Sequence, residues 1–370
     1  MKITIHDLAF GGEGVGRHEG AAVFVSFAAV GDEVDVKIVE KKKSFLRAEI
    51  VEIVKASQTR EKAPCPYYGI CGGCQYQHIT YQAELSAKEK QLRDTLARVG
   101  KISDPVIRQI IACPAPYGYR NRITVHNERG KMGFRATNNR DLVDVEKCLL
   151  ATDEVNEKLK KLRERPRPRP HYSVRGDAVA GEAFHQTNAL LTSSLQKLVC
   201  DALDSKIQAI VEGYAGVGFF TEPLSGKVEK IIAIESDEKA VSFRSGHDRV
   251  CSGSSHHIHR SCECDAITPR AKNIQWICGT CEEHLASAAR ELNNFNAACL
   301  VDPPREGLSK IVAQDLFHSS FEQILYLSCN PSTLARDLQI LSPKWKAEYF
   351  QPIDIFPRTA HLECLVVLRK

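Results

Sequence analysis

Three residues near the C-terminal end have the types and order needed for covalent chemistry on a pyrimidine ring. Cys329 follows the apolar run 324–327, and Asp302 follows the apolar stretch 297–301. Both lie just past predicted strands, where open α/β sheets carry their reactive groups. A thiolate that adds to C6 of a uracil makes C5 nucleophilic towards a methyl donor, and a base must then remove the C5 proton. We predict Cys329 as the nucleophile, Glu363 as the base and Asp302 as a polar anchor.

The neighbours of Cys329 bear on whether it reacts. A single cysteine at a strand end is more often a small buried apolar residue than a nucleophile. Here Asn330 and Pro331 follow directly, and they favour a functional cysteine. The chemistry also requires a thiol of low pKa.

A glycine-rich turn predicts a nucleotide-binding site. The segment 212–220, Glu-Gly-Tyr-Ala-Gly-Val-Gly-Phe-Phe, follows the apolar run 207–211, and the next apolar strand, 231–234, ends in Glu235. Glycines at the first turn and an acid closing the second strand are typical of a doubly wound sheet. Glu235 is then suited to hydrogen bond with ribose hydroxyls.

Three cysteines in one glycine-bearing loop predict an inorganic centre. Cys65, Cys71 and Cys74 have the spacing C-x5-C-x2-C, and the glycines allow the tight turns that let three thiolates converge. Cys148 is the best candidate for a fourth ligand. Zinc is the main competing occupant, and unbound buried cysteines are the remaining alternative.

The stretch 244–270 fits no regular element. It contains four histidines and three cysteines with little apolar periodicity: His247, Cys251, His256, His257, His259, Cys262 and Cys264. A zinc site is one interpretation, although no pair has a clean ligand spacing. An insertion without a packed role is favoured, and translation from a shifted reading frame is a third possibility.

Length and composition indicate a globular protein of two or three domains. The chain has 370 residues, 43% hydrophobic and 26% charged, with a net charge of +4. This mild basicity permits a polyanionic partner without requiring one. Neither a signal peptide nor a membrane span is expected, so we predict a cytoplasmic protein without a membrane partner. Fourteen cysteines then indicate metal, cluster or catalytic use rather than disulfides.

The remaining segments suggest three regions. Residues 1–57 are predicted as short strands, with a glycine-dense loop at 11–17 and three lysines, 41–43, at a hairpin tip. A helix is predicted over 78–100, with Leu85, Leu92, Leu96 and Val99 on one stripe. A second helix over 153–163 leads into alternating Arg and Pro at 163–170, which is typical of an extended connector.

Several of these motifs together resemble a known family. Ser-Cys-Asn-Pro at 328–331, Asp-Pro-Pro-Arg-Glu-Gly at 302–307 and Phe-Pro-x-Thr-x-His-x-Glu at 356–363 are similar to those of RNA uracil-C5 methyltransferases. Phe-x-Gln-x-Asn at 184–188 is similar to the family's first cofactor-binding motif. Residues 1–57 resemble a TRAM domain, a small RNA-binding β-barrel. The cysteine loop makes the chain most similar to the enzymes that act on bacterial 23S ribosomal RNA.

This resemblance implies roles for particular residues. It makes Cys329 the nucleophile and Glu363 the base, and it makes the four-cysteine centre a four-iron, four-sulfur cluster. The residues expected to line the S-adenosylmethionine pocket are Gln186, Tyr214, Glu235 and Asp302. Two departures occur: Ala215 replaces the family's usual Cys, and Cys278-Gly279-Thr280-Cys281 stands where an acid is usual, which puts the adenine contacts in doubt.

We therefore predict a Rossmann-like α/β methyltransferase with an OB-like N-terminal barrel. The expected domains are 1–57 (TRAM), 58–77 with 106–182 (iron–sulfur), and 78–105 with 183–370 (methyltransferase). The expected reaction is methylation of uridine C5 in structured RNA, most readily 23S ribosomal RNA. Transfer RNA is the first rival substrate. A non-catalytic RNA-binding protein with a decayed transferase fold is the second rival.

Overall fold

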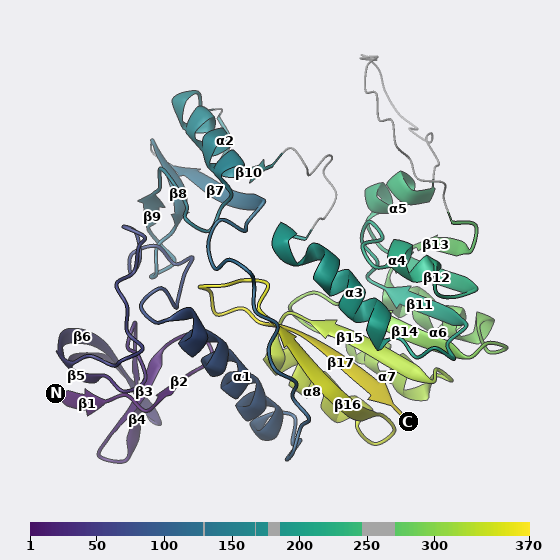
Figure 1. Ribbon diagram of the computed structural model, residues 1–370, viewed down its shortest axis with the longest axis horizontal. Helices are drawn as coiled ribbons and strands as arrows, with labels where there is room; N and C mark the ends of the chain where they lie inside the picture. Colours follow the sequence, from purple (N-terminus) through teal and green to yellow (C-terminus); the bar gives the residue numbers. More distant parts are fainter. Residues whose placement is uncertain (129, 167, 177–185, 246–270) are drawn as a thin grey trace.

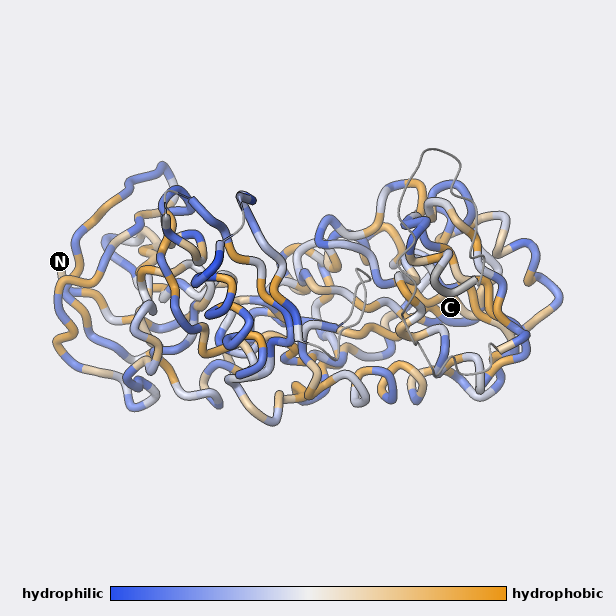
Figure 2. The backbone as a smooth tube through the Cα atoms, turned by 90° about the horizontal axis from the view of Figure 1, so that it is seen from above, coloured by the Kyte–Doolittle hydropathy of each residue, from blue (hydrophilic) through white to orange (hydrophobic). Residues whose placement is uncertain are grey.

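The structure, a computed structural model, describes residues 1–128, 130–166, 168–176, 186–245 and 271–370. Two predictions fall outside these residues: Phe184 of the cofactor motif, and nearly all of the 244–270 stretch with its histidines and cysteines. The described residues form an N-terminal sheet, a smaller central sheet and a large C-terminal sheet (Figure 1). Viewed from above, the molecule is elongated, with the N-terminus at one end and the C-terminal sheet towards the other (Figure 2). The predicted domain limits stay a prediction.

The N-terminal sheet has six strands in the order β1-β5-β6-β4-β3-β2. Their bounds are β1 Lys2–Thr4, β2 Asp7–Leu8, β3 Gly14–His18, β4 Ala21–Val25, β5 Glu33–Lys41 and β6 Phe45–Lys55. The pairing is antiparallel except between β4 and β6. Alternating apolar residues such as Val23, Val25, Val34 and Val36 form its core. The three lysines fall at the β5–β6 hairpin, as the sequence predicted.

The glycine-dense loop between β2 and β3 packs on another part of the chain. Gly12 has φ +94°, and a Cβ atom there would lie 2.7 Å from Cβ of Gln75 and 3.3 Å from the ring of Tyr76. Only a glycine fits this close approach. The loop therefore holds the N-terminal sheet against the segment that follows the cysteine loop.

The central sheet has four antiparallel strands in the order β10-β7-β8-β9. Their bounds are β7 Arg122–Glu128, β8 Lys131–Arg135, β9 Leu142–Asp144 and β10 His171–Arg175. Helix α2 (Asp153–Glu164) packs Val155 and Leu159 on one face of the sheet, against Val125 and Tyr172. Thr152 caps this helix by accepting a hydrogen bond from the N–H of Val155.

The C-terminal sheet has seven strands in the order β13-β12-β11-β14-β15-β17-β16. Their bounds are β11 Ala209–Gly213, β12 Lys230–Glu235, β13 Ile274–Cys278, β14 Ala297–Val301, β15 Gln323–Ser328, β16 Lys346–Ile353 and β17 Glu363–Arg369. The first five strands are parallel, while β17 runs antiparallel to β15 and β16. This is the doubly wound arrangement that the sequence predicted.

Helices cover both faces of this sheet. One face carries α1 (Tyr81–Arg98), α6 (Cys281–Glu291), α7 (Lys310–His318) and α8 (Pro331–Leu341). The other carries α3 (Thr192–Ala202), preceded by the 3-10 turn η1 (Ala189–Leu191), and α4 (Thr221–Ser225). Helix α5 (Glu238–Ser245) follows β12. Leu85, Leu92 and Leu96 of α1 are buried as predicted, but Val99 is 41% exposed because the helix ends at Arg98. No helix in the described part of the chain is long and apolar enough to cross a membrane.

A buried ion network fixes the segment that leads into β17. Lys88 of α1 lies 2.8 Å from Glu84 and 2.7 Å from Asp354, and all three side chains are at most 1% exposed. The hydroxyl of Tyr81 donates to the other oxygen of Asp354 at 2.8 Å. Burial raises the pKa of Glu84 to about 7, against the opposing charge of Lys88. Lys88 therefore supplies the positive charge that two buried carboxyl groups share.

Arg358 extends this network towards the cysteine loop. Its backbone has φ +66°, and its N–H donates to Glu84 at 2.7 Å. Its guanidinium donates to the carbonyl of Ile79 at 2.8 Å, and its carbonyl accepts from the N–H groups of Gln75 and Tyr76. The left-handed turn at Arg358 thus binds α1 and the segment after the cysteines at once.

We predict that Lys88→Met destabilises the protein by about 3–5 kcal/mol, because it leaves Asp354 buried without its cation and leaves Glu84 with only Arg358, at 3.7 Å. The matched control is Lys90→Met on the same helix, whose pairs with Asp7 and Asp94 leave Lys90 52% exposed. The control should cost under about 1 kcal/mol. Urea unfolding followed by tryptophan fluorescence measures both, and equal costs would contradict a central role for Lys88.

Candidate active site

The predicted nucleophile, base and polar anchor lie together at one edge of the sheet, past the carboxyl ends of β14 and β15 and at the start of β17. Asp302 follows β14 and Cys329 follows β15. Glu363 is the first residue of β17, whose register pairs Ser328 with Cys364, so Glu363 lies alongside Cys329. Glu363 and Asp302 both raise the pKa of Cys329, and Asp302 raises the pKa of Glu363. The fold therefore brings a thiol and two carboxyl groups into one cluster.

Asn330 and Pro331 have a structural role in this cluster. The side chain of Asn330 accepts from the N–H of Ser332 at 3.0 Å and caps α8, and Pro331 fills the first turn, where no N–H is needed. The Asn330 amide also donates to the carbonyl of Arg305 at 3.2 Å. The helix start therefore holds both Cys329 and the loop after β14.

That loop is anchored further by Asp337, which is fully buried on α8. Its carboxylate accepts from the N–H of Leu308 at 2.8 Å and from the hydroxyl of Tyr326 at 2.7 Å. Gly307 has φ +76°, and a Cβ atom there would lie 2.5 Å from the same carboxylate. A larger residue at 307 would push the Asp302–Arg305 segment away from Cys329.

Sequence reasoning missed two residues of the site, Arg305 and His361. A guanidinium nitrogen of Arg305 lies 3.2 Å from Nε2 of His361. Burial, and then the charge of Arg305, lower the pKa of His361 to about 4. Arg305 also lowers the pKa values of Cys329 and Glu363, against the larger effect of their burial. Both residues stand in quoted motifs, but spacing alone could not show that they meet.

The expectation of a low-pKa thiol is wrong for the free protein. Burial raises the pKa of Cys329 to about 11, and the nearby carboxyl groups of Glu363 and Asp302 raise it further, while Arg305 opposes them. Two acids close to a thiol disfavour a second negative charge. Cys329 is therefore a neutral thiol at neutral pH until something else changes its surroundings.

The two carboxyl groups are also shifted. Burial raises the pKa of Asp302 to about 7. Burial, and then Asp302, raise the pKa of Glu363 well above its usual value. A carboxyl group that titrates near neutral pH, as Asp302 does, can both take and give a proton, as acid–base catalysis requires.

Glu235 and Tyr214 meet at the ends of β11 and β12. The carboxylate of Glu235 accepts from the N–H of Gly216 at 2.7 Å and from the N–H of Asp237 at 2.8 Å. Tyr214 adopts φ +61°, and burial raises its pKa. Glu235 thus shapes the turn and keeps lone pairs available for hydroxyl groups.

Gln186 lies away from this turn, between the central sheet and the C-terminal one. Its carbonyl accepts from the amide of Asn121 at 2.9 Å. Two residues on, the buried Asn188 donates to the carbonyl of Ile355 at 2.8 Å. Among the four predicted cofactor residues, Glu235 and Tyr214 are therefore adjacent, Asp302 lies with Cys329, and Gln186 lies on a separate segment.

The departures from the family pattern have local explanations. Cys278 ends β13 and is exposed, whereas Cys281 begins α6 and is buried. Thr280 and Glu283 form a reciprocal capping box at this helix start. Ala215 is buried, so its replacement of a cysteine leaves the packing closed.

The four predicted ligand cysteines line one cavity. Cys65, Cys71, Cys74 and Cys148 surround about 60 Å³ of free volume, several times the roughly 10–15 Å³ that one buried water needs. Burial raises the pKa values of Cys71, Cys74 and Cys148, and neighbouring cysteines raise them further. Arg120 also lines the cavity and opposes that increase.

A single metal ion has no ready-made site at these cysteines. In the described ranges there is no group of three or more His, Cys, Asp or Glu residues that could hold a metal ion. A cluster of several irons spreads its thiolate ligands over different metal atoms, so the sulfurs need not converge on one point. Four thiols around a roomy, largely apolar cavity fit such a group.

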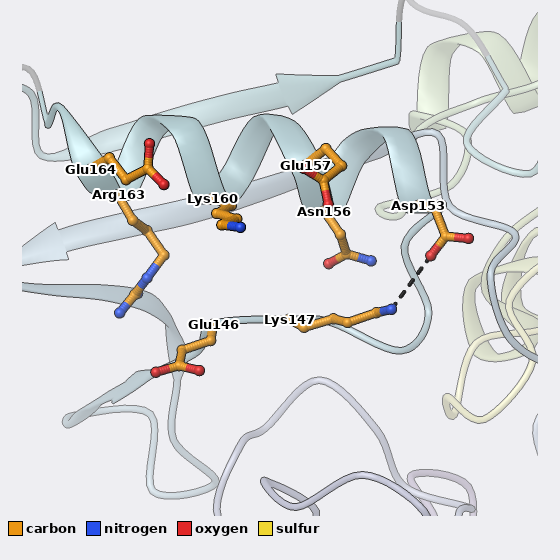
Figure 3. A pocket seen from close by; sticks show the side chains of 8 residues that line it. All are labelled: Glu146, Lys147, Asp153, Asn156, Glu157, Lys160, Arg163 and Glu164. Atoms are coloured by element: carbon orange, nitrogen blue, oxygen red, sulfur yellow. Dashed lines mark hydrogen bonds and ion pairs between the residues drawn. The ribbon is translucent and has the colours of Figure 1, made fainter.

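A larger, open cavity lies elsewhere. It has a volume of about 440 Å³ and lies between α2 and the segment with Glu146 and Lys147 (Figure 3). Its lining includes four acids and three bases, and Lys147 and Asp153 approach to 3.4 Å across it. Opposite charges nearly cancel here, so this cavity suits no strongly charged ligand.

Comparison with known proteins identifies the family. Residues 144–370, more than half of the chain, match the tRNA (Uracil-5-)-methyltransferase family, and residues 1–51 match the TRAM domain. The chain belongs to the tRNA (uracil-5-)-methyltransferase family. The predicted enzyme class, an S-adenosylmethionine-dependent RNA (uracil-C5-)methyltransferase, and the predicted TRAM domain are confirmed.

Relatives span the whole chain. An uncharacterized RNA methyltransferase of Bdellovibrio bacteriovorus is 31% identical over 396 residues, covering all of this chain and 95% of that protein. One of Aquifex aeolicus is 28% identical over 438 residues, covering 100% and 98%. The solved tRNA (uracil-54, C5)-methyltransferase of Pyrococcus abyssi, in complex with S-adenosyl-L-homocysteine, is similar with a TM-score of 0.69 at 21% identity over 100% of both chains. This likeness confirms the predicted α/β methyltransferase fold.

We predict that alkylation of Cys329 by iodoacetamide accelerates about tenfold per pH unit between about pH 7 and 9, because a pKa of about 11 leaves the thiolate fraction rising throughout. Arg305→Gln should slow the alkylation of Cys329 further at each pH. Lys310 is an exposed cation at the start of α7, and Lys310→Gln should leave the rate unchanged. Peptide mass spectrometry of the Cys329 peptide measures both. A rate that levels off below about pH 7 would show a low-pKa thiol instead.

Proposed function

We propose that this chain transfers a methyl group from S-adenosylmethionine to C5 of a uridine in RNA, through a covalent bond between Cys329 and C6 of the uracil. One observation carries this proposal. The β15–β17 register sets Glu363 beside Cys329 at the end of a doubly wound sheet. A nucleophile with an adjacent base is the arrangement that covalent catalysis needs. RNA is the substrate class of the family, and we place the enzyme in the cytoplasm.

The proposed reaction runs in two halves. As the Cys329 sulfur bonds to C6, its proton passes to Asp302, whose pKa of about 7 leaves it able to accept one, and the ring electrons move towards C5 and the O4 carbonyl. C5 then attacks the methyl group, and S-adenosylhomocysteine leaves. Glu363 takes the C5 proton, the C6–S bond breaks, and the double bond between C5 and C6 is restored. Arg305 offsets the negative charge that develops beside it.

The raised thiol pKa supports a substrate-triggered reaction. A thiol that is neutral in the free protein reacts only when the uracil occupies the site and its proton has an acceptor. We propose that Gln186, Tyr214, Glu235 and Asp302 line the S-adenosylmethionine pocket. When bound there, this group supplies the electrophilic methyl.

We further propose that Cys65, Cys71, Cys74 and Cys148 hold a four-iron, four-sulfur cluster with a structural role. The shared cavity and the mutual repulsion of its thiols support this assignment. The cysteine loop also adjoins the segment bound by Arg358, so a cluster would stiffen the support of the active site.

Ribosomal RNA is the proposed substrate, because the cysteine loop makes the chain resemble the 23S enzymes. Transfer RNA is the second candidate, and one observation favours it. A protein described as a tRNA (uracil-54, C5)-methyltransferase matches all of this chain, including its first 57 residues and its cysteine segment. The presence of an N-terminal barrel therefore does not separate the two substrates.

The covalent step can be trapped with 5-fluorouridine RNA. Fluorine at C5 blocks proton removal, so the protein should accumulate a stable RNA–protein adduct with a substituted 23S ribosomal transcript and not with substituted transfer RNA. Cys329→Ala should form none, whereas Cys200→Ala, which removes a thiol on α3, should still form it. Denaturing gels measure the adduct. An adduct with Cys329→Ala would exclude the proposed nucleophile, and one with transfer RNA alone would favour the second substrate.

Protein purified without oxygen should be brown, with iron and sulfide in roughly equal amounts. Cys74→Ser should lose the colour and both elements, because the substitution leaves the proposed cluster with three thiol ligands instead of four. Cys113→Ser is the matched control, since Cys113 is a buried thiol outside this cavity. Zinc without sulfide would overturn the cluster assignment.

A further inference from the structure

One face of the central sheet has an unusual set of cross-strand pairs. The register of β7 with β10 sets Arg122 opposite Arg175, Thr124 opposite Ser173, and His126 opposite His171. We call these six residues the polar face of the central sheet. The alternate residues, Ile123, Val125, Tyr172 and Val174, point to the other face and pack beneath α2. The polar face is therefore the one that α2 does not cover.

Like charges directly opposite each other destabilise a strand pair. Arg122 and Arg175 are nevertheless held close together, because the Nε groups of both donate to the hydroxyl of Ser173, at 3.0 and 3.3 Å. Burial, and then the charge of Arg175, lower the pKa of Arg122. The sheet thus presents two guanidinium groups side by side on this face.

The composition of the face suits a phosphate backbone. Its six residues include no carboxylate, and Glu128, the next in line on β7, is ion-paired with Arg135. Arg, Ser and Thr are among the side chains that contact phosphate oxygens. Alternate residues along a strand are about 6.7 Å apart, so the three pairs form a row along which successive phosphates of an extended strand could lie.

The face also leads to the proposed active site. Asn121 lies next to Arg122. Its side-chain amide donates to the carbonyl of Gln186, and its backbone N–H donates to the carbonyl of Thr187. Asn188 then binds Ile355, in the segment that continues to His361 and Glu363. An RNA strand on the polar face would therefore approach the site from the side of Gln186.

We propose that the polar face of the central sheet binds the phosphate backbone of the RNA substrate beside the target uridine. This proposal rests on the proposed function in one respect only, that the ligand is RNA. The face acts through charge and hydrogen bonding to the backbone, so it positions the RNA without reading its sequence.

The test compares two double variants of equal charge. Arg122→Gln with Arg175→Gln alters the polar face, whereas Lys160→Gln with Lys161→Gln removes two exposed cations from α2, across the sheet. The Kd for a fluorescein-labelled RNA stem-loop with a uridine-rich loop is measured by anisotropy over a range of KCl concentrations. The full-length, cluster-loaded protein is used throughout.

The polar-face variant should bind about tenfold more weakly at about 150 mM KCl, and its slope of log Kd against log salt should fall by about 1.4, since each phosphate contact contributes about 0.7. The α2 variant should change the Kd less than about twofold and leave the slope unaltered. Arg122→Lys with Arg175→Lys keeps both positive charges, so this variant should retain the wild-type slope. A retained slope would show that the effect of the glutamine variant comes from lost charge and not from lost folding.

Equal slopes of log Kd against log salt in the polar-face and α2 glutamine variants would overturn the proposal. A slope reduced in the lysine variant as much as in the polar-face glutamine variant would also overturn it. Failure of the proposed function gives a different result. If the wild-type protein methylates no uridine but the slope difference remains, the face binds RNA and the assigned reaction is wrong. If the wild type methylates uridine and the slopes are equal, the reaction stands and the polar face is wrong.

Discussion

The placement of Glu363 depends on a positive charge that is buried far from it in sequence. Lys88 sits between Glu84 and Asp354, and Arg358 joins the same group by donating to Glu84. Breaking a buried ion pair leaves an uncompensated charge and costs several kcal/mol, whereas an exposed pair is worth little. This network therefore fixes how the chain turns from β16 into β17, and with it the residue that faces Cys329.

The same turn unites regions that are separate in sequence. The carbonyl of Arg358 accepts two N–H groups from the segment after the cysteine loop, and the hydroxyl of Tyr119 donates to the carbonyl of Pro357 at 2.9 Å. Asn188 binds the carbonyl of Ile355. The segment after the cysteine loop, the residues just before the central sheet and the cofactor motif thus all contact the chain between β16 and β17, which carries His361 and leads into Glu363. A change in any of them, such as loss of a cluster or binding of RNA, can reach the proposed base through short contacts.

Much of this architecture could be predicted from sequence, because strand-end motifs and the glycine turn report local geometry. The doubly wound sheet, the N-terminal strands and the helices α1 and α2 followed from periodicity and turn residues. The pairing of β17 between β15 and β16 could not be predicted, since register depends on tertiary contacts. Lys88 looked like one more cation on a charged helix face, and only burial shows its role. The low thiol pKa was wrong because sequence could not show the burial that is the main cause of the raised pKa of Cys329.

In the proposed reaction, Glu363 removes the C5 proton from a uracil already bonded to Cys329. The most direct test is the mass of the protein–RNA species that Glu363→Gln forms on ordinary uridine RNA with S-adenosylmethionine. An amide cannot accept the proton, so a covalent species carrying the added methyl group should accumulate. Free turnover near the wild-type rate, with no covalent species, would show that another group is the base.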